Sequence, residues 1–166
     1  MAMHLNISRG ARMVAIIGLA LMVAACANKP KSTGAVGGVG GASTPGSSQD
    51  FVVNVGDRVF FETDSTELTI VSRTTLDRQA AWLNQYGRYA ITIEGHADER
   101  GTREYNIALG ARRAEVVRDY LSSRGVGSNR FRTISYGKER PVAVCDDISC
   151  WSQNRRAVTV VNTAGS

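Results

Sequence analysis

The sequence lacks two features that would place it in common functional classes. It has no large excess of charge of one sign, with 20 Lys and Arg against 15 Asp and Glu. Such a weakly basic, mixed balance does not favour nucleic-acid binding. It also lacks a long apolar run near its start, because Met13 to Val23 covers only 11 residues. A transmembrane helix needs about 20 apolar residues, so this run does not predict a membrane span.

The first 26 residues have the layout of an export signal. Arg9 and Arg12 give a basic start, the apolar run follows, and the segment ends in VAAC at residues 23–26. VAAC resembles the lipobox of bacterial lipoprotein signal peptides, which implies that Cys26 becomes the lipidated first residue after cleavage. The alternative is an ordinary signal peptide with an incidental cysteine. By the same resemblance, Ala27 in place of Asp favours sorting to the outer membrane.

Removal of this leader leaves 18 Lys and Arg against 15 acids, a net charge of +3, and two cysteines besides Cys26. Cys145 and Cys150 lie in VCDDISCW, and an exported chain enters a compartment where such a pair is normally oxidised. We predict a disulfide contributing roughly 2 kcal/mol. A zinc site is the alternative, but only Asp146 and Asp147 are near and the spacing matches no common zinc motif. We expect no metal and no cofactor.

Residues 27–50 are rich in Gly, Ser, Ala and Thr, with almost nothing to bury, and predict a flexible linker. A folded domain is expected over residues 51–161, followed by a short tail at 162–166. Hydrophobic patterning predicts six elements in this domain. They are a strand over 51–61, a helix that Gly87 ends, a strand over 89–96, a helix from its cap Thr102 to Arg124, and strands over 130–137 and 155–161.

The order β-α-β-α-β-β indicates an α/β two-layer sandwich, in which the helices pack on one face of a small mixed sheet. In such folds the loops from strand to helix share one edge, where ligands tend to bind. The FETDS and GHADERG segments are these two loops. We therefore expect Asp64 and Asp98 to lie near each other.

One charged side chain is predicted to face the core. With about 100° per residue and Leu109 at zero, Arg113 falls near 40° and Asn106 near 60°, inside the apolar arc of the second helix. A buried guanidinium needs an anion, and Asp98 and Asp64 are the candidates. Such a pair is either an internal bridge between helix and loop or a binding site. As a site it suits a zwitterion, because Arg holds a carboxylate through two hydrogen bonds while Asp accepts an ammonium.

Four segments together resemble the OmpA-like C-terminal domain family: VFFETDSTEL, IEGHADERGTREYNIALGARRAEVV, ISYGKERP and NRRAV. The similarity covers about residues 51–161. It implies a non-enzymatic domain that binds peptidoglycan non-covalently through the diaminopimelate of the stem peptide. It also implies TolB and other Tol proteins as partners, an outer-membrane lipid anchor, and a domain that faces the periplasm.

The resemblance assigns a role to each matching position. Asp98 resembles the acid that meets the ammonium, and Arg113 the arginine that meets the free carboxylate. Arg156 matches an arginine that closes the pocket. The surrounding wall is formed by Asp64, Thr102, Asn106 and Leu109. Two departures stand out: Glu62 replaces the usual Asp of the first loop, and the CDDISC segment is not general in the family.

Two other functions are considered, an enzyme and an OmpA-like lipoprotein without Tol partners. Residues 136–138, after the third strand, are more typical of a turn than of a ligand contact. Glu94, Asp98 and Glu99 could be the paired carboxylates of a wall hydrolase. An arginine partner on Asp98 would lower the pKa of that carboxyl and spoil it as a general acid, which argues against hydrolysis. For His96 we favour a structural role at the strand end over a role in orienting the pocket. Arg112 is expected to face solvent, where it could meet TolB.

Overall fold

The computed structural model describes residues 43–163. The predictions for the leader, for lipidation of Cys26 and for most of the linker concern residues outside this range. Residues 43–50 belong to the predicted linker, yet they pack on the domain. The main-chain oxygen of Gly46 accepts a hydrogen bond from Tyr89 Oη at 2.8 Å, and Asp50 Oδ2 accepts one from Trp82 Nε1 at 2.8 Å.

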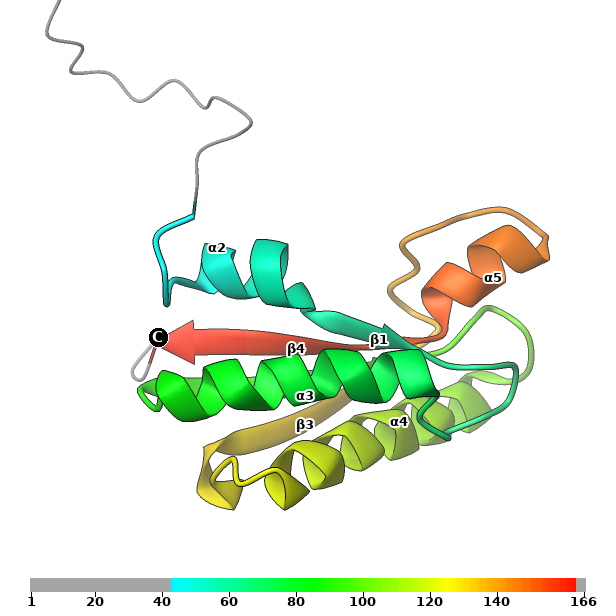
Figure 1. Ribbon diagram of the computed structural model, residues 1–166. Helices are drawn as coiled ribbons and strands as arrows, with labels where there is room; N and C mark the ends of the chain where they lie inside the picture. The colour runs from blue at the N-terminus through cyan, green and yellow to red at the C-terminus, as the bar shows by residue number, and fades with distance from the viewer. Residues whose placement is uncertain (1–42, 164–166) are drawn as a thin grey trace, which may run out of the picture. The chain divides into compact units, whose positions relative to one another are not determined.

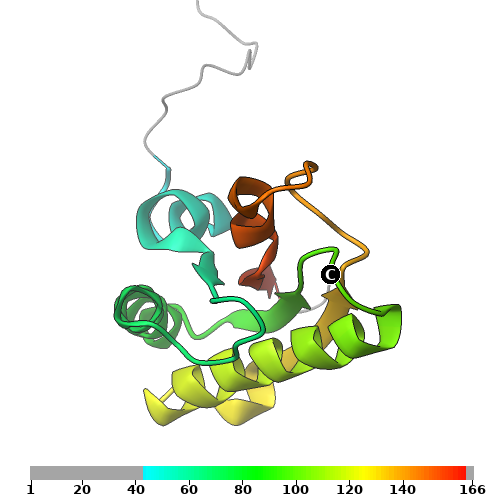
Figure 2. The same ribbon diagram turned by 90° about the vertical axis from the view of Figure 1, so that its right-hand side faces the viewer.

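Four strands form one mixed sheet in the order β1-β4-β2-β3. β2 runs parallel to β3, whereas β4 is antiparallel to both of its neighbours, β1 and β2. Figures 1 and 2 show the two long helices, α3 and α4, along one side of this sheet. The predicted fold class is therefore confirmed. The bounds are β1 Arg58–Phe60, α3 Ile70–Gln85, β2 Tyr89–His96, α4 Arg103–Ser123, β3 Phe131–Gly137 and β4 Arg156–Thr163.

The hydrophobic core lies between the sheet and the two helices. Strand β2 alternates as a half-covered strand should, because Ile91 and Ile93 are fully buried while Thr92 and Glu94, each of which follows one of them, are half-buried. α4 presents Ala114, Val117 and Leu121 to the same core. Continuous burial on one face fixes the register of the strands, since a shift by one residue would turn every apolar side chain outward.

Helix α4 begins and ends where the sequence predicts. Thr102 is its N-cap, and its hydroxyl oxygen accepts a hydrogen bond from the main-chain nitrogen of Tyr105 at 3.2 Å. Past the other end, Gly125 has a φ of 88°, the left-handed conformation that glycine adopts most easily.

Two glycines bring α4 unusually close to the sheet. A Cβ atom on Gly95 of β2 would lie 1.8 Å from the main-chain oxygen of Gly110, and one on Gly110 would lie 2.5 Å from Ser135 Oγ. No side chain fits between the two main chains at this crossing. The crossing therefore sets the depth of α4, and with it the positions of Asn106 and Arg113 one turn away on either side.

The predicted strand over 51–61 is wrong in its first half. Residues Phe51–Gly56 form a turn of π-helix (η2) that continues the short helix α2, Ser48–Asp50. Phe51 is fully buried and packs on the ring of Trp82, with centroids 4.9 Å apart, while Val52 and Val53 are exposed. Packing of one aromatic ring thus overrides the β propensity of the valines.

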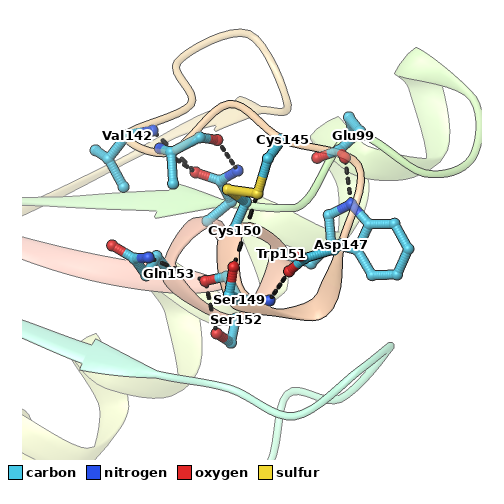
Figure 3. The surroundings of a disulfide bond; sticks show 11 residues. Glu99, Val142, Cys145, Asp147, Ser149, Cys150, Trp151, Ser152 and Gln153 are labelled. Atoms are coloured by element: carbon cyan, nitrogen blue, oxygen red, sulfur yellow. Dashed lines mark hydrogen bonds between the residues drawn. A yellow bond between two sulfur atoms is a disulfide. The ribbon is translucent and has the colours of Figure 1, made fainter.

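Between β3 and β4 the chain forms a segment that we call the disulfide arm, residues 142–154. It contains the unpredicted helix α5, Ile148–Asn154, and the disulfide between Cys145 and Cys150, which confirms the predicted pairing (Figure 3). Asn154 closes the arm: its side chain accepts from the main-chain nitrogen of Val142 at 2.9 Å and donates to the oxygen of Ala143 at 2.8 Å. The 3-10 turn η3, also unpredicted, covers Ser128–Arg130.

Candidate ligand-binding site

The two predicted strand-to-helix loops meet at the N-terminal end of α4 and enclose a cavity of about 250 Å³. Four of its lining residues are charged, the carboxylates of Asp64 and Asp98 and the guanidinium groups of Arg113 and Arg100. The expectation that Asp64 and Asp98 lie near each other is thus confirmed. The remaining lining residues are Thr63, Gly101, Tyr105, Asn106 and Leu109.

Arg113 is fully buried, as its place on the helix predicts, but its partners are not the predicted carboxylates. It donates to three main-chain oxygens, from Nε to Ser65 at 2.9 Å, from Nη1 to His96 at 2.8 Å and from Nη2 to Glu62 at 3.2 Å. The ring of Phe61 lies beside it, 5.1 Å from the guanidinium carbon. Burial and the charge of Arg155 lower the pKa of Arg113 to about 10. The guanidinium remains a cation at neutral pH.

Asp98 is bound by two other arginines, so the internal Arg113–Asp98 bridge, one of the two interpretations of this pair, is not formed. Arg100, two residues along the loop, donates from Nη2 to Oδ2 at 2.7 Å and from Nε to Oδ1 at 3.2 Å. Arg155 adds a hydrogen bond to Oδ2 at 3.3 Å. Burial raises the pKa of Asp98, but the hydrogen bonds from Arg100 and Arg155 outweigh it, and the pKa lies below its usual value. The carboxylate is therefore charged at neutral pH.

Asp64 also lines the cavity. It is exposed, and its Oδ1 accepts a hydrogen bond from the hydroxyl of Tyr105 on α4, a contact that raises the pKa of that phenol. Asp64 has a φ of 54°, a conformation that is uncommon outside glycine. Because strained backbone of this kind concentrates at functional sites, the conformation of Asp64 fits a role in binding.

Neighbouring elements hold the loop of residues 97–102 against α4. Asn106 is buried and donates from Nδ2 to the main-chain oxygen of Arg100 at 2.7 Å. From the turn after β3, Lys138 donates from Nζ to the oxygen of Gly101 at 2.7 Å, and the oxygen of Gly137 accepts from the nitrogen of Ala97 at 2.8 Å. The loop that presents Asp98 is thus anchored at several points.

Five of the seven binding residues predicted from the sequence line this cavity: Asp64, Asp98, Asn106, Leu109 and Arg113. Thr102 lies next to it as the cap of α4 but is not part of its lining. Arg156 is not brought to the cavity. Its neighbour Arg155 contacts Asp98 in its place, and it also donates from Nε to the oxygen of Phe61 at 3.0 Å.

The local structure explains why Arg155, and not Arg156, contacts Asp98. Arg155 is the C-cap of α5 and Arg156 begins β4, so their side chains leave the chain on opposite sides. Without α5 in the predicted element order, the sequence alone does not say which arginine of NRRAV faces the loops. Tyr105 was also missed, because its place on the helix predicts burial, whereas it is 46% exposed.

Arg156 lies beside His96 on the face of the sheet away from α3 and α4. Both ring nitrogens of His96 and the Nε of Arg156 are buried and have no hydrogen-bond partner among residues 43–163. Burial and the charges of Arg156, Arg140 and Arg58 lower the pKa of His96 to about 4. His96 therefore stays neutral at physiological pH, which agrees with a structural role.

Residues 43–163 show neither a metal-binding cluster nor a membrane-spanning helix. Within residues 43–163 there is no group of three or more His, Cys, Asp or Glu side chains placed to hold a metal ion. Over the same residues, no helix has both the length and the hydropathy to cross a bilayer. The cavity beside Arg113 is polar and has charges of both signs, so it suits a small ligand that carries one positive and one negative charge.

Comparison with known proteins identifies the family of this chain. A model of the OmpA family matches residues 60–156. The chain belongs to the OmpA family. Within that family it is 65% identical over 164 residues to the peptidoglycan-associated lipoprotein of Rhizobium meliloti, covering 97% of this chain and 93% of the relative. It is 67% identical to the same protein of Agrobacterium fabrum over 151 residues, 89% of this chain and 85% of the relative.

A solved structure supports the same assignment. The crystal structure of the peptidoglycan-associated lipoprotein from Burkholderia pseudomallei superposes with a TM-score of 0.66 at 39% identity, and covers 70% of this chain and all of that one. Membership of this non-enzymatic family sets the hydrolase interpretation of Glu94, Asp98 and Glu99 aside.

Proposed function

We propose that this chain is an outer-membrane lipoprotein that binds peptidoglycan non-covalently through the diaminopimelate of the stem peptide. It tethers the outer membrane to the cell wall within the Tol-Pal system during envelope constriction and cell division. The names of the relatives support association with peptidoglycan, and VAAC supports a lipid anchor on Cys26. A diacylated or triacylated cysteine holds a chain stably in a bilayer, whereas one acyl chain does not.

The burial of Arg113 without a carboxylate partner is the observation on which the proposal rests. Three of its five N–H groups donate to main-chain oxygens, and the other two have no acceptor among residues 43–163. The nearby charges of Asp98 and Asp64 favour the cation, but none of its hydrogen bonds goes to a carboxylate, and a bound anion would complete its environment. The free carboxylate of diaminopimelate supplies this anion.

The other side of the cavity suits the ammonium of the same amino-acid group. Asp98 and Asp64 both line the cavity that holds the guanidinium. A zwitterion with its carboxylate toward Arg113 and its ammonium toward Asp98 pairs both charges. The volume of about 250 Å³ fits the end of one side chain better than a whole glycan unit. Asn106, Leu109 and Thr102 support the wall.

The proposal is tested by sacculus pull-down with Asp98→Asn, which keeps shape and removes charge, and Arg113→Lys, which keeps charge and removes the fork of donors. Hydrogen bonds to charged groups contribute roughly 1.5 to 3 kcal/mol, so each change should weaken wall binding by on the order of 10- to 100-fold. Asp119→Asn and Arg112→Lys, the same substitutions at exposed positions of α4, should leave binding intact.

Walls that lack diaminopimelate provide the ligand control, and wild-type chain should not be retained on them. Circular dichroism checks that each variant is folded. Unchanged binding by folded Asp98→Asn and Arg113→Lys would mean that the cavity is only an internal polar cluster. Arg112 also lies on the exposed face that we propose for TolB, so loss of TolB binding in Arg112→Lys with wall binding kept would separate the two surfaces.

A further inference from the structure

The disulfide arm reaches the cavity loop through one side chain, Trp151 of α5. Its Nε1 donates a hydrogen bond to Glu99 Oε1 (Figure 3). The guanidinium of Arg100 lies over its indole ring, with the Arg100 Cζ atom 4.2 Å from the ring centroid. Trp151 thus contacts two consecutive residues of the loop that carries Asp98, both of them exposed to solvent.

Arg100 connects Trp151 to the cavity. Its guanidinium holds both carboxylate oxygens of Asp98, at 2.7 and 3.2 Å, while its side chain remains 41% exposed at the rim. Half-exposed ion pairs of this kind usually exchange between several arrangements, because ordering a long side chain costs entropy. An aromatic face against the guanidinium restricts Arg100 to one arrangement.

The construction of the arm fixes the direction of the indole. Trp151 directly follows Cys150, which the disulfide links to Cys145, and Asn154 at the end of α5 ties the helix to residues 142 and 143. Cys150 and Asn154 are buried although most of the arm is exposed. Residues on either side of Trp151 are therefore fixed, and the ring has a defined position above the loop.

We propose that Trp151 is a positioning residue of the ligand cavity. By stacking on Arg100 and binding Glu99, it keeps the loop in the form that presents Asp98 to the ammonium of a ligand. The arm thereby raises affinity through preorganisation rather than through contact with the ligand, since a loop ordered beforehand pays less on binding. This inference rests on the proposed function, because it takes diaminopimelate as the ligand.

The experiment uses the whole chain, purified in detergent, and titrates it with a soluble disaccharide-tripeptide that contains meso-diaminopimelate. Trp151→Ala removes both contacts and should lower affinity about 5- to 20-fold. Trp151→Phe keeps an aromatic face for Arg100 and should remain within about 3-fold of wild type. Ile148→Ala, at an exposed position of the same short helix, is the matched control and should bind normally.

A double-mutant cycle separates positioning from a general loss of structure. If Trp151 acts through Arg100, the pair Arg100→Ala and Trp151→Ala should bind no worse than Arg100→Ala alone. Combined with Arg113→Lys, by contrast, the effect of Trp151→Ala should add. Ligand should also change the tryptophan fluorescence of wild type and not of Trp151→Phe, because the other tryptophan, Trp82, is buried in the core away from the cavity.

The outcomes distinguish this inference from the proposed function. Wild-type affinity in a folded Trp151→Ala chain, or effects of Trp151→Ala and Arg100→Ala that simply add, would overturn the positioning role. If Asp98→Asn in the same assay still weakens binding by on the order of 10- to 100-fold, the proposed function survives that result. If Asp98→Asn also binds normally, the proposed function itself fails.

Discussion

The cavity is held by two regions of very different character. The first, which we call the β2–α4 frame, comprises β2, α4 and the loop of residues 97–102 between them. Its apolar residues Ile93, Ala114, Val117 and Leu121 are all fully buried. The second is the disulfide arm, in which Val142, Val144 and Ile148 are 54%, 88% and 59% exposed. One region is part of the core, and the other is held by a disulfide and a few polar contacts.

This difference indicates that the two regions have different roles in stability and in ligand binding. The frame places Arg113, Asn106 and the main chain of Asp98, so a change there should damage fold and binding together. The arm contacts the loop through Trp151, at the rim. Changes in the arm should therefore alter affinity while the fold persists, because few buried contacts depend on it. Three predictions test this division, in order of decreasing effect on stability.

The largest effect is expected from Gly95→Ala in the frame. The added methyl group would lie 1.8 Å from the main-chain oxygen of Gly110, and neither main chain can yield without moving α4. Overpacking of this kind should cost on the order of 3 kcal/mol or more and displace Arg113. Urea denaturation measures the loss. Gly87→Ala is the matched control, because nothing lies within 4 Å of its added atom.

A smaller effect should appear as a pH dependence caused by His96. Its pKa is about 4 in the folded chain and about 6.5 when unfolded, so the unfolded state binds the extra proton first as pH falls. The free energy of unfolding should thus decrease by about 2 kcal/mol between pH 7 and pH 5. The one other histidine, His4, lies in the predicted leader.

Denaturation of the leaderless chain at several pH values measures this dependence, and His96→Asn should flatten it. A slope that persists unchanged in His96→Asn would assign the effect to another group. Because His96 is buried at the end of β2, this pH dependence reports on the frame and not on the arm.

The sequence predicts the frame well because several local signals agree there. Alternation in β2, the cap Thr102, the stop Gly125 and the apolar arc of α4 all point to the same elements, and they place Arg113 and Asn106 inward. What the sequence does not give is the partner of each charge. Arg113 binds main-chain oxygens, and no periodicity reveals the direction of a carbonyl group.

The arm and the first strand were predicted poorly for a different reason. Helix α5 has seven residues and follows a loop with no hydrophobic period, so its pattern is too short to recognise. The resemblance to the family pointed to Arg156, whereas Arg155 is the arginine that contacts Asp98. Residues 51–56 are rich in valine, and tertiary contacts hold them in a helical form, namely the packing of Phe51 on Trp82 and the hydrogen bond from Gln79 to the oxygen of Gly56.

The smallest effect on global stability is expected when the disulfide is removed by the double substitution Cys145→Ser and Cys150→Ser. Loop entropy sets an upper value of about 2 kcal/mol, and the observed loss should be lower because the arm can open without unfolding the core. Hydrogen exchange should increase at the amides of α5 while those of β2 and α4 keep their protection. Reduction of the wild-type chain should reproduce this pattern. If exchange increased equally in β2 and α4, the arm and the frame would form one cooperative unit, and the division between them would be wrong.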